Sequence, residues 1–296
     1  MRRHLPLFLF FFVPCMLRAQ REAHLVYNGM VDRAMASAAR HDHLAAVASY
    51  DSAIAVLPWE PAIYFDAVLS ALATGRTDKA NTWLLTGVAN GFDPTLFTDP
   101  AWVRFMDSEE SAPYRQRADQ CRANFTSRAD TAFIAQLDAM YRRDQITRDG
   151  SAEMLRNDSL NFEELITRCD AHGFPSAVEI GPSIGVVHLL LWHHRGPEYP
   201  DSPQWQRILP FIHTAMDAGR LDPAFLCMFD DLNDKDHGRP MRYGALLGYY
   251  RNMPEEVFLV DPVTLTMNRA SVGWGPIADF ADVVGVDPRL IRYAVK

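Results

Sequence analysis

The chain has 296 residues, of which 48% are hydrophobic and 22% are charged, and its formal net charge at pH 7 is −8. This is the composition of an ordinary globular protein. The acidic excess argues against two classes of function: binding to the phosphate backbone of nucleic acids, which requires a basic surface, and electrostatic adhesion to anionic lipid.

Residues 1–19 are predicted to be a cleaved signal peptide for export. A basic start precedes an apolar run from Leu5 to Leu17, and the small residue Ala19 stands directly before Gln20. As a helix, this run would span only about 20 Å, whereas a bilayer core requires ~20 apolar residues. We therefore expect a protein exported to the periplasm or the extracellular space, with no stable membrane span after cleavage.

Two alternatives to a cleaved signal remain open. One is an uncleaved membrane anchor, and the other is a lipoprotein attached through Cys15, although Pro14 does not fit the pattern of a lipoprotein signal. Cleavage would remove three arginines and no acidic residue, so the mature chain would carry 26 basic against 37 acidic residues, a net charge of −11. That larger excess strengthens the argument against nucleic acid as a partner.

Residues 20–125 are predicted to form tetratricopeptide-like helical repeats. A shift of 34 residues aligns three positions spaced four and then three apart, and Pro58 closes the first unit where a helix must stop. This period and spacing resemble the tetratricopeptide repeat, in which small side chains let paired antiparallel helices approach closely. The aligned pairs are Ala46 with Ala80, Tyr50 with Leu84, and Ala53 with Gly87.

Such repeats cannot bury their apolar faces alone, so the two units must be capped by residues 98–122 or by the domain that follows. Arrays of this kind most often act as interaction surfaces or spacers. The resemblance therefore implies a protein partner bound by the repeat region. It makes a protein-interaction or scaffold role the favoured function.

Residues 126–296 are predicted to form a second, mainly helical domain. Met241–Tyr250 and Val257–Val260 carry β-branched and aromatic residues near Gly and Pro, which favours a small β-hairpin. The fold class predicted for the whole chain is mainly α: a short tetratricopeptide-like array followed by a mostly helical domain with that hairpin. From start and stop signals, helices are expected at 131–149, 159–172, 183–195, 202–219, 222–234, 276–284 and 288–295.

Several motifs in this second domain resemble an uncharacterised bacterial domain family. That family is marked by Asp-Gln-x-x-Arg, Gly-x-Pro, a helix-ending His, and Gly-(Lys/Arg)-Pro-Gln-x-Tyr-Gly-Thr-Gln. The chain departs from the last motif, with Met241 in place of Gln and Ala245-Leu246 in place of Thr-Gln. Because members are mostly of unknown function, the resemblance implies an architecture more than an activity. The matching segments are Asp144–Arg148, Gly173–Pro175, His193–His194 and Gly238–Gly244.

The helix expected at 131–149 carries a charged pair on its apolar face. At about 100° per residue, Asp144 and Arg148 fall on the same stripe as Leu137 and Met140. Residues four apart on a helix can pair, but burying the pair is costly unless it is fully hydrogen-bonded. Three interpretations stay open: a buried clamp between helices, a solvated pair, or the floor of a polar pocket.

In the pocket interpretation, Asp144 serves as an acid, a base or a ligand anchor, and Arg148 binds an anion. An enzyme or a small-ligand binder with this pocket is therefore the alternative function. His193 and His194 could instead cap the end of their own helix. The complete candidate cluster is Asp144, Gln145, Arg148, His193, His194, Asp230, Asp231 and Tyr243.

No motif predicts a cofactor or a metal ion, and the sequence leaves open whether the chain is an enzyme. The acidic stretch Asp230–Gly238 fails the EF-hand spacing because Leu232 occupies its third position. Cys121, Cys169 and Cys227 allow at most one intramolecular disulfide. We expect Cys169 and Cys227, at apolar helical positions, to be small buried hydrophobic residues.

Overall fold

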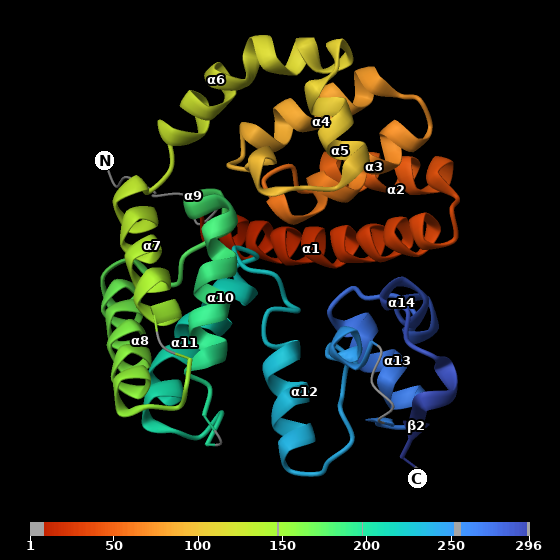
Figure 1. Ribbon diagram of the computed structural model, residues 1–296. Helices are drawn as coiled ribbons and strands as arrows, with labels where there is room; N and C mark the ends of the chain where they lie inside the picture. Colours follow the sequence, from red (N-terminus) through yellow and green to blue (C-terminus); the bar gives the residue numbers. More distant parts are fainter. Residues whose placement is uncertain (1–8, 147, 197, 252–255, 295–296) are drawn as a thin grey trace, which may run out of the picture.

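The computed structural model describes residues 9–146, 148–196, 198–251 and 256–294, with side chains from Gln20 onward (Figure 1). Helices make up most of these residues, which confirms the predicted mainly α fold class. The helices pack around three separate hydrophobic cores, in residues 27–121, 133–229 and 241–291. The stretch predicted as one C-terminal domain therefore contains two cores.

The first core joins helices packed as successive hairpins. Asp42 caps α2 by accepting a hydrogen bond from the amide of Ala45. A Cβ atom at Gly87 would lie 2.8 Å from the ring of Tyr64, so only glycine permits this close approach between α3 and α4. The helices are α1 (Leu9–Ala39), α2 (His43–Val56), α3 (Tyr64–Ala73), α4 (Thr77–Val88), α5 (Pro100–Asp107) and α6 (Ala112–Thr126).

The second core lies among helices that stand beside one another in Figure 1. The helix expected to start at Ser159 begins earlier, at Ala152, because the Ser151 hydroxyl caps it by accepting from the Met154 amide. The preceding helix ends at Ile146. The elements are α7 (Thr131–Ile146), α8 (Ala152–His172), α9 (Ala177–Ile180), α10 (Ile184–His193) and α11 (Pro203–Asp217).

The third core contains the two described strands, which pair in parallel, Val257 opposite Ile291. Val257–Leu259 is a strand where β structure was expected, but its partner is a distant segment, so the pair is not a hairpin. The helix expected at 288–295 is reduced to a single 3-10 turn at Pro288–Leu290, because Ile291 to Tyr293 pair with that strand. The elements are α12 (Cys227–Asp236), β1 (Val257–Leu259), α13 (Pro262–Ser271), α14 (Ile277–Val284) and β2 (Ile291–Tyr293).

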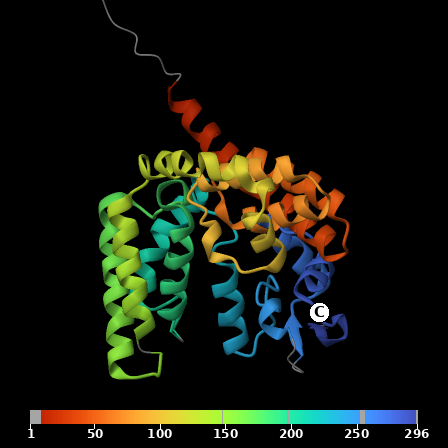
Figure 2. The same cartoon turned by 45° about the horizontal axis from the view of Figure 1, so that its top comes forward.

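The end of the chain returns to its first long helix. Asn28 of α1 donates hydrogen bonds to the carboxylate of Asp222 at 2.8 Å and to the carbonyl of Val272 at 2.9 Å. Gly273, at φ +82°, lies so close to α1 that a Cβ atom there would overlap the backbone of Leu25. In Figure 2 the hairpin helices accordingly extend over both of the other groups of helices.

Within the described residues, no single helix combines the length and apolar composition that a membrane span requires. One bent pair, Ala152–His172 with Ala177–His193, meets those two requirements together. Cys121, Cys169 and Cys227 are all free and buried, and burial raises the pKa of Cys169 to about 12. Cys169 and Cys227 are thus small buried hydrophobic residues, as expected.

Candidate functional site

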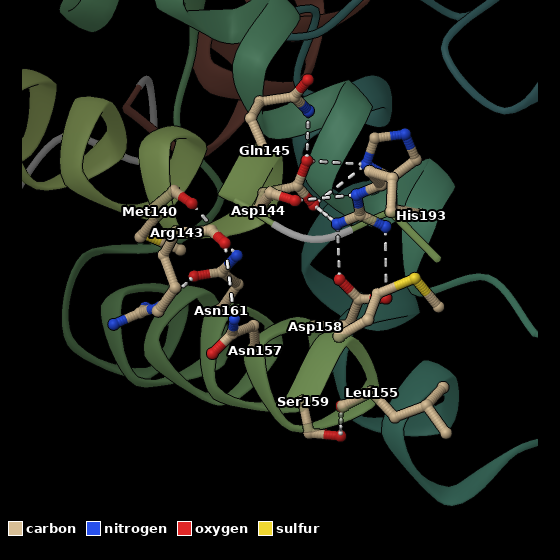
Figure 3. Close-up of polar contacts among 12 residues, drawn as sticks. Met140, Arg143, Asp144, Gln145, Leu155, Asn157, Asp158, Ser159, Asn161 and His193 are labelled. Carbon is tan, nitrogen blue, oxygen red and sulfur yellow. Dashed lines mark hydrogen bonds and ion pairs between the residues drawn. The ribbon is translucent and has the colours of Figure 1, made fainter. Parts of the chain in front are cut away.

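The predicted charged pair lies at the centre of a buried polar cluster near the end of α7 (Figure 3). The carboxylate of Asp144, 1% exposed, accepts a hydrogen bond from the guanidinium of Arg148 and another from Gln145 Nε2 at 2.6 Å. The ring nitrogen Nδ1 of His193, on α10, lies 2.8 Å from its Oδ2 atom. Arg148 also donates to the Asp158 carboxylate of α8 at 2.6 Å. Asp144 and Arg148 therefore join three helices.

A second link beside this cluster also ties α7 to α8 (Figure 3). Arg143 Nε donates to the side-chain oxygen of Asn161 at 2.8 Å, and Asn161 Nδ2 donates to the carbonyl of Met140 at 3.1 Å. Buried polar groups are stabilising only when their hydrogen bonds are made, and here they are made. Asp144, Asp158 and Asn161 are buried as the clamp interpretation requires, whereas Gln145 and Arg148 reach the surface.

One ring nitrogen of His193 is not held by the Asp144 carboxylate. His193 presents Nδ1 to Asp144, and its other ring nitrogen points away from the carboxylate (Figure 3). A carboxylate that holds an imidazole in this way fixes the orientation of the ring. His194 is not part of the cluster, because its ring packs on Phe162 with centroids 4.2 Å apart. Burial lowers the pKa of His194.

The remaining predicted residues form a second cluster on α12 and the loop after it. Asp231, fully buried, accepts hydrogen bonds from the backbone amides of Arg242 and Tyr243 at 2.7 and 2.9 Å. Burial raises the pKa of Asp231 to about 6 despite these bonds. Asp230 instead accepts from the Tyr199 hydroxyl at 2.9 Å. Asp231 therefore orders the loop through its backbone.

A different set of residues lines the central cleft, which we define as two adjoining hollows of about 410 and 260 Å³ that share four lining residues. The cleft lies where α1, the turn before α3, the segment between α11 and α12, and the loop before α14 meet. Its volume is in the range of small-ligand sites. None of the eight predicted site residues lines it. The shared residues are Glu60, Asp222, Trp274 and Phe280.

Three carboxylates line the central cleft: Glu60 and Asp222 border both hollows, and Asp32 borders the smaller one. The half-buried Glu60 carboxylate makes no hydrogen bond or ion pair with any described residue. Burial and the nearby Asp222 carboxylate raise the pKa of Glu60 to about 7. Burial also raises the pKa of Asp222, although its Oδ1 atom accepts from Asn28 Nδ2 and from the amide of Ala224, both at 2.8 Å. Its Oδ2 atom accepts no such bond.

The basic groups around the central cleft are engaged elsewhere. Arg269, 2% exposed, donates to the carbonyls of Gly275 at 2.6 Å and Tyr243 at 2.9 Å, and its third contact is Asp32 at 3.4 Å. Burial lowers the pKa of Arg269 and raises that of Asp32.

Arg220 is exposed at the rim, where it donates to the carbonyl of Phe174. Two histidines complete the surroundings: burial lowers the pKa of His188 to about 4 and also lowers that of His24, so both are neutral at pH 7.

Sequence reasoning missed the cleft because its walls come from segments near both ends of the chain, from Tyr27 to Phe280, and neither shared carboxylate lies in a motif. The one local signal was Asp222-Pro223, which was interpreted only as a helix start. Within the described part of the chain, no group of three or more His, Cys, Asp or Glu side chains could hold a metal ion.

Comparison with known proteins adds no family. No family model matches this chain, and no curated protein and no solved structure matches it significantly. The resemblances to the tetratricopeptide repeat and to the uncharacterised bacterial domain therefore stay predictions. Any functional argument has to rest on the geometry.

Proposed function

We propose that this chain is an exported small-ligand binding protein whose ligand occupies the central cleft. The observation that carries the proposal is the Glu60 carboxylate, which is half-buried, lines both hollows and has no partner among the described residues. An unpaired carboxylate in such a position costs free energy unless a ligand compensates it. Perturbed groups of this kind gather at functional sites.

The shape of the cleft supports the same proposal. Its walls combine a few polar groups with apolar side chains, which is the composition of ligand sites. The helix face that borders it is also unusual for a repeat array, because α1 is covered there by the chain's own C-terminal segments. Part of the surface that a protein partner would use is therefore already occupied. The apolar wall includes Ile184, Leu221, Phe225 and Met228.

A protein partner on the repeats is the second candidate. It is supported by two exposed leucines in the repeat region: Leu44 on α2, with 60% of its surface exposed, and Leu96 in the connection between α4 and α5, with 73%. These two residues are isolated apolar positions, and isolated positions of this kind are common on protein surfaces. The cleft therefore remains the stronger argument.

A variant that fills the cleft tests the proposal. Gly185 of α10 lines the larger hollow, and a Cβ atom added there would meet no atom within 4 Å. Gly185→Trp should fold normally and lose the ligands that the wild-type chain binds in a small-molecule fragment screen followed by ligand-observed NMR. Ala48→Trp, at an exposed position of α2 outside the cleft, is the matched control and should keep them. Fragments that bind equally to Gly185→Trp would refute a site in the cleft.

A further inference from the structure

We propose that the central cleft selects a ligand with a protonated amine, whose ammonium group lies between the carboxylates of Glu60 and Asp222 while its apolar body packs on the wall. This inference rests on the proposed function, since it names the class of ligand for the same site. The reason is that several carboxylate oxygens in the cleft accept no hydrogen bond from a described residue, while the nearby basic groups have other partners.

The open hydrogen-bond acceptors of the cleft are carboxylate oxygens. Both oxygens of Glu60 and the Oδ2 atom of Asp222 accept no hydrogen bond from a described residue, whereas Oδ1 of Asp222 accepts two. An ammonium group has three donors and no acceptor, so it matches three open carboxylate oxygens. A carboxylate or phosphate ligand would instead face two like charges.

The charges around the cleft also favour a cationic ligand. The Arg269 guanidinium bonds to two carbonyls, contacts Asp32, and stands over the rings of Trp274 and Phe280, 5.2 and 5.4 Å from their centroids. Together with Asp32 it is close to neutral. Arg220 lies at the exposed rim.

The two histidines near the cleft are neutral at pH 7 because burial lowers their pKa values. His24 accordingly leaves its Nδ1 atom without a partner, and the other ring nitrogen lies 3.2 Å from the carbonyl of Gly219. No basic side chain among the described residues forms an ion pair with Glu60 or Asp222, although the His24 ring and the Asp222 carboxylate interact electrostatically. A cation from outside can form such a pair.

A divalent metal ion fits this site less well than an amine. Two carboxylates are too few ligands for a Ca²⁺ or Mg²⁺ site, and the described residues offer no third His, Cys, Asp or Glu ligand there. The wall beside them is apolar, formed by side chains such as Leu221, Phe225 and Met228. An organic cation uses both features, because its charge meets the carboxylates and its carbon skeleton meets the wall.

The proposal has a proton-linked signature. The pKa of Glu60 lies at about 7 in the free protein, so part of the population is protonated near neutral pH. An ammonium ion stabilises the ionised carboxylate and lowers this pKa, so binding must release a proton. Affinity should consequently rise as the pH increases from about 6 to 8.

The test uses three probes with the same indole body: tryptamine, which is cationic, tryptophol, which is neutral, and indole-3-propionate, which is anionic. Isothermal titration at pH 7 in two buffers of different ionisation enthalpy gives affinity and proton release together. We expect tryptamine to bind about tenfold more tightly than tryptophol, with proton release. Glu60→Gln should weaken tryptamine about tenfold and abolish the release, without weakening tryptophol.

Glu153→Gln is the matched control, because Glu153 is exposed on α8 and outside the cleft. It should change neither quantity by more than about twofold. Asp222→Asn gives a second variant, with its melting temperature recorded because Asp222 also accepts from Asn28.

Equal binding of the three probes, with loss of all three in Gly185→Trp, would overturn the amine inference and leave the ligand-binding function standing. Absence of tryptamine binding at millimolar concentration would also overturn the amine inference, and the fragment screen with Gly185→Trp would then decide the ligand-binding function separately.

Discussion

Glu60 lies in a short turn between two helices, where a sequence alone suggests a solvated carboxylate. In the folded chain, segments from beyond residue 180 close over this turn and leave the carboxylate half-buried beside Asp222. For Asp144, by contrast, the sequence does predict the burial that the structure shows. Its place on an apolar stripe could be predicted from helix periodicity, and the structure indeed buries it, whereas its partner Arg148 stays exposed. Local periodicity identifies a buried position, but it carries no information about contacts from distant segments.

The raised pKa of Glu60 makes the stability of the free protein depend on pH. Its folded-state pKa is about 7 and its ordinary value is 4.5, so between these values the folded chain holds a proton that the unfolded chain releases. The free energy of unfolding should therefore fall as the pH rises through this window, by at most about 3 kcal/mol from this residue. Glu60→Gln should remove that part of the dependence and be the more stable protein at about pH 8.

Urea denaturation at about pH 4.5 and pH 8 measures the effect. The exposed control Glu153→Gln should follow the wild-type curve at both pH values. If the Glu60→Gln variant and the wild-type chain lose the same free energy of unfolding between these two pH values, Glu60 does not have the burial that the cleft requires.

Three helices of the middle core depend on one polar cluster. Asp144 of α7 holds Arg148, Arg148 reaches Asp158 of α8, and His193 of α10 completes the link. The apolar contacts of these helices could slide along one another, whereas directional hydrogen bonds fix a single register. The cluster therefore has a specific structural effect in addition to any role of the outward nitrogen of His193.

Asp144→Asn should destabilise the fold by about 3 kcal/mol, because the buried Asp144 carboxylate would lose its charge-assisted contacts with Arg148 and His193. Thermal and urea denaturation give this value. Asp138→Asn is the control, since Asp138 pairs with Arg142 of the same helix at an exposed position, and it should cost less than about 1 kcal/mol.

If Asp144→Asn melts like the wild-type chain but binds a different set of fragments, the cluster is a binding site and the clamp interpretation fails.

Helix positions were predicted well where capping signals are local. Ser202 with Pro203 predicted the start of α11, and Ser202 does cap that helix. The strand Ile291–Tyr293 was predicted as helix because its β structure depends on Val257–Leu259, some 34 positions earlier, as its partner. Likewise Asp231 was grouped with Asp144 from sequence order. Its actual partners are the amides of Arg242, Tyr243 and Ala245.

As a whole, the molecule is tied together by α1. This helix contributes to the first core and also forms hydrogen bonds to Asp222, Val272 and Gly275 in the other two regions. Two loops can approach it because they carry glycine, Gly219 and Gly273, both with positive φ. We expect the three cores to unfold in one transition as long as these contacts hold.

Gly273→Val should separate the third core from α1. A β-branched residue is strained at φ +82°, and its Cβ would overlap the backbone of Leu25. Hydrogen exchange measured by mass spectrometry should then become faster in residues 257–294 and around Asn28, with little change in the middle core. Gly248→Ala, which has an ordinary φ and a Cβ contact of 3.7 Å to Val284, should leave exchange unchanged. Unchanged protection in Gly273→Val would contradict a tight contact between the chain's two ends.

The position of α1 also bears on the order in which the chain can fold during synthesis. Helix α1 carries buried polar residues, His24 and Asn28, whose hydrogen-bond partners are synthesised nearly 200 residues or more later. Until the last segment emerges, these side chains remain unpaired and the adjoining apolar face stays open to water. The chain should therefore complete this part of its native structure only after the segments around Gly219 and Val272 have been synthesised.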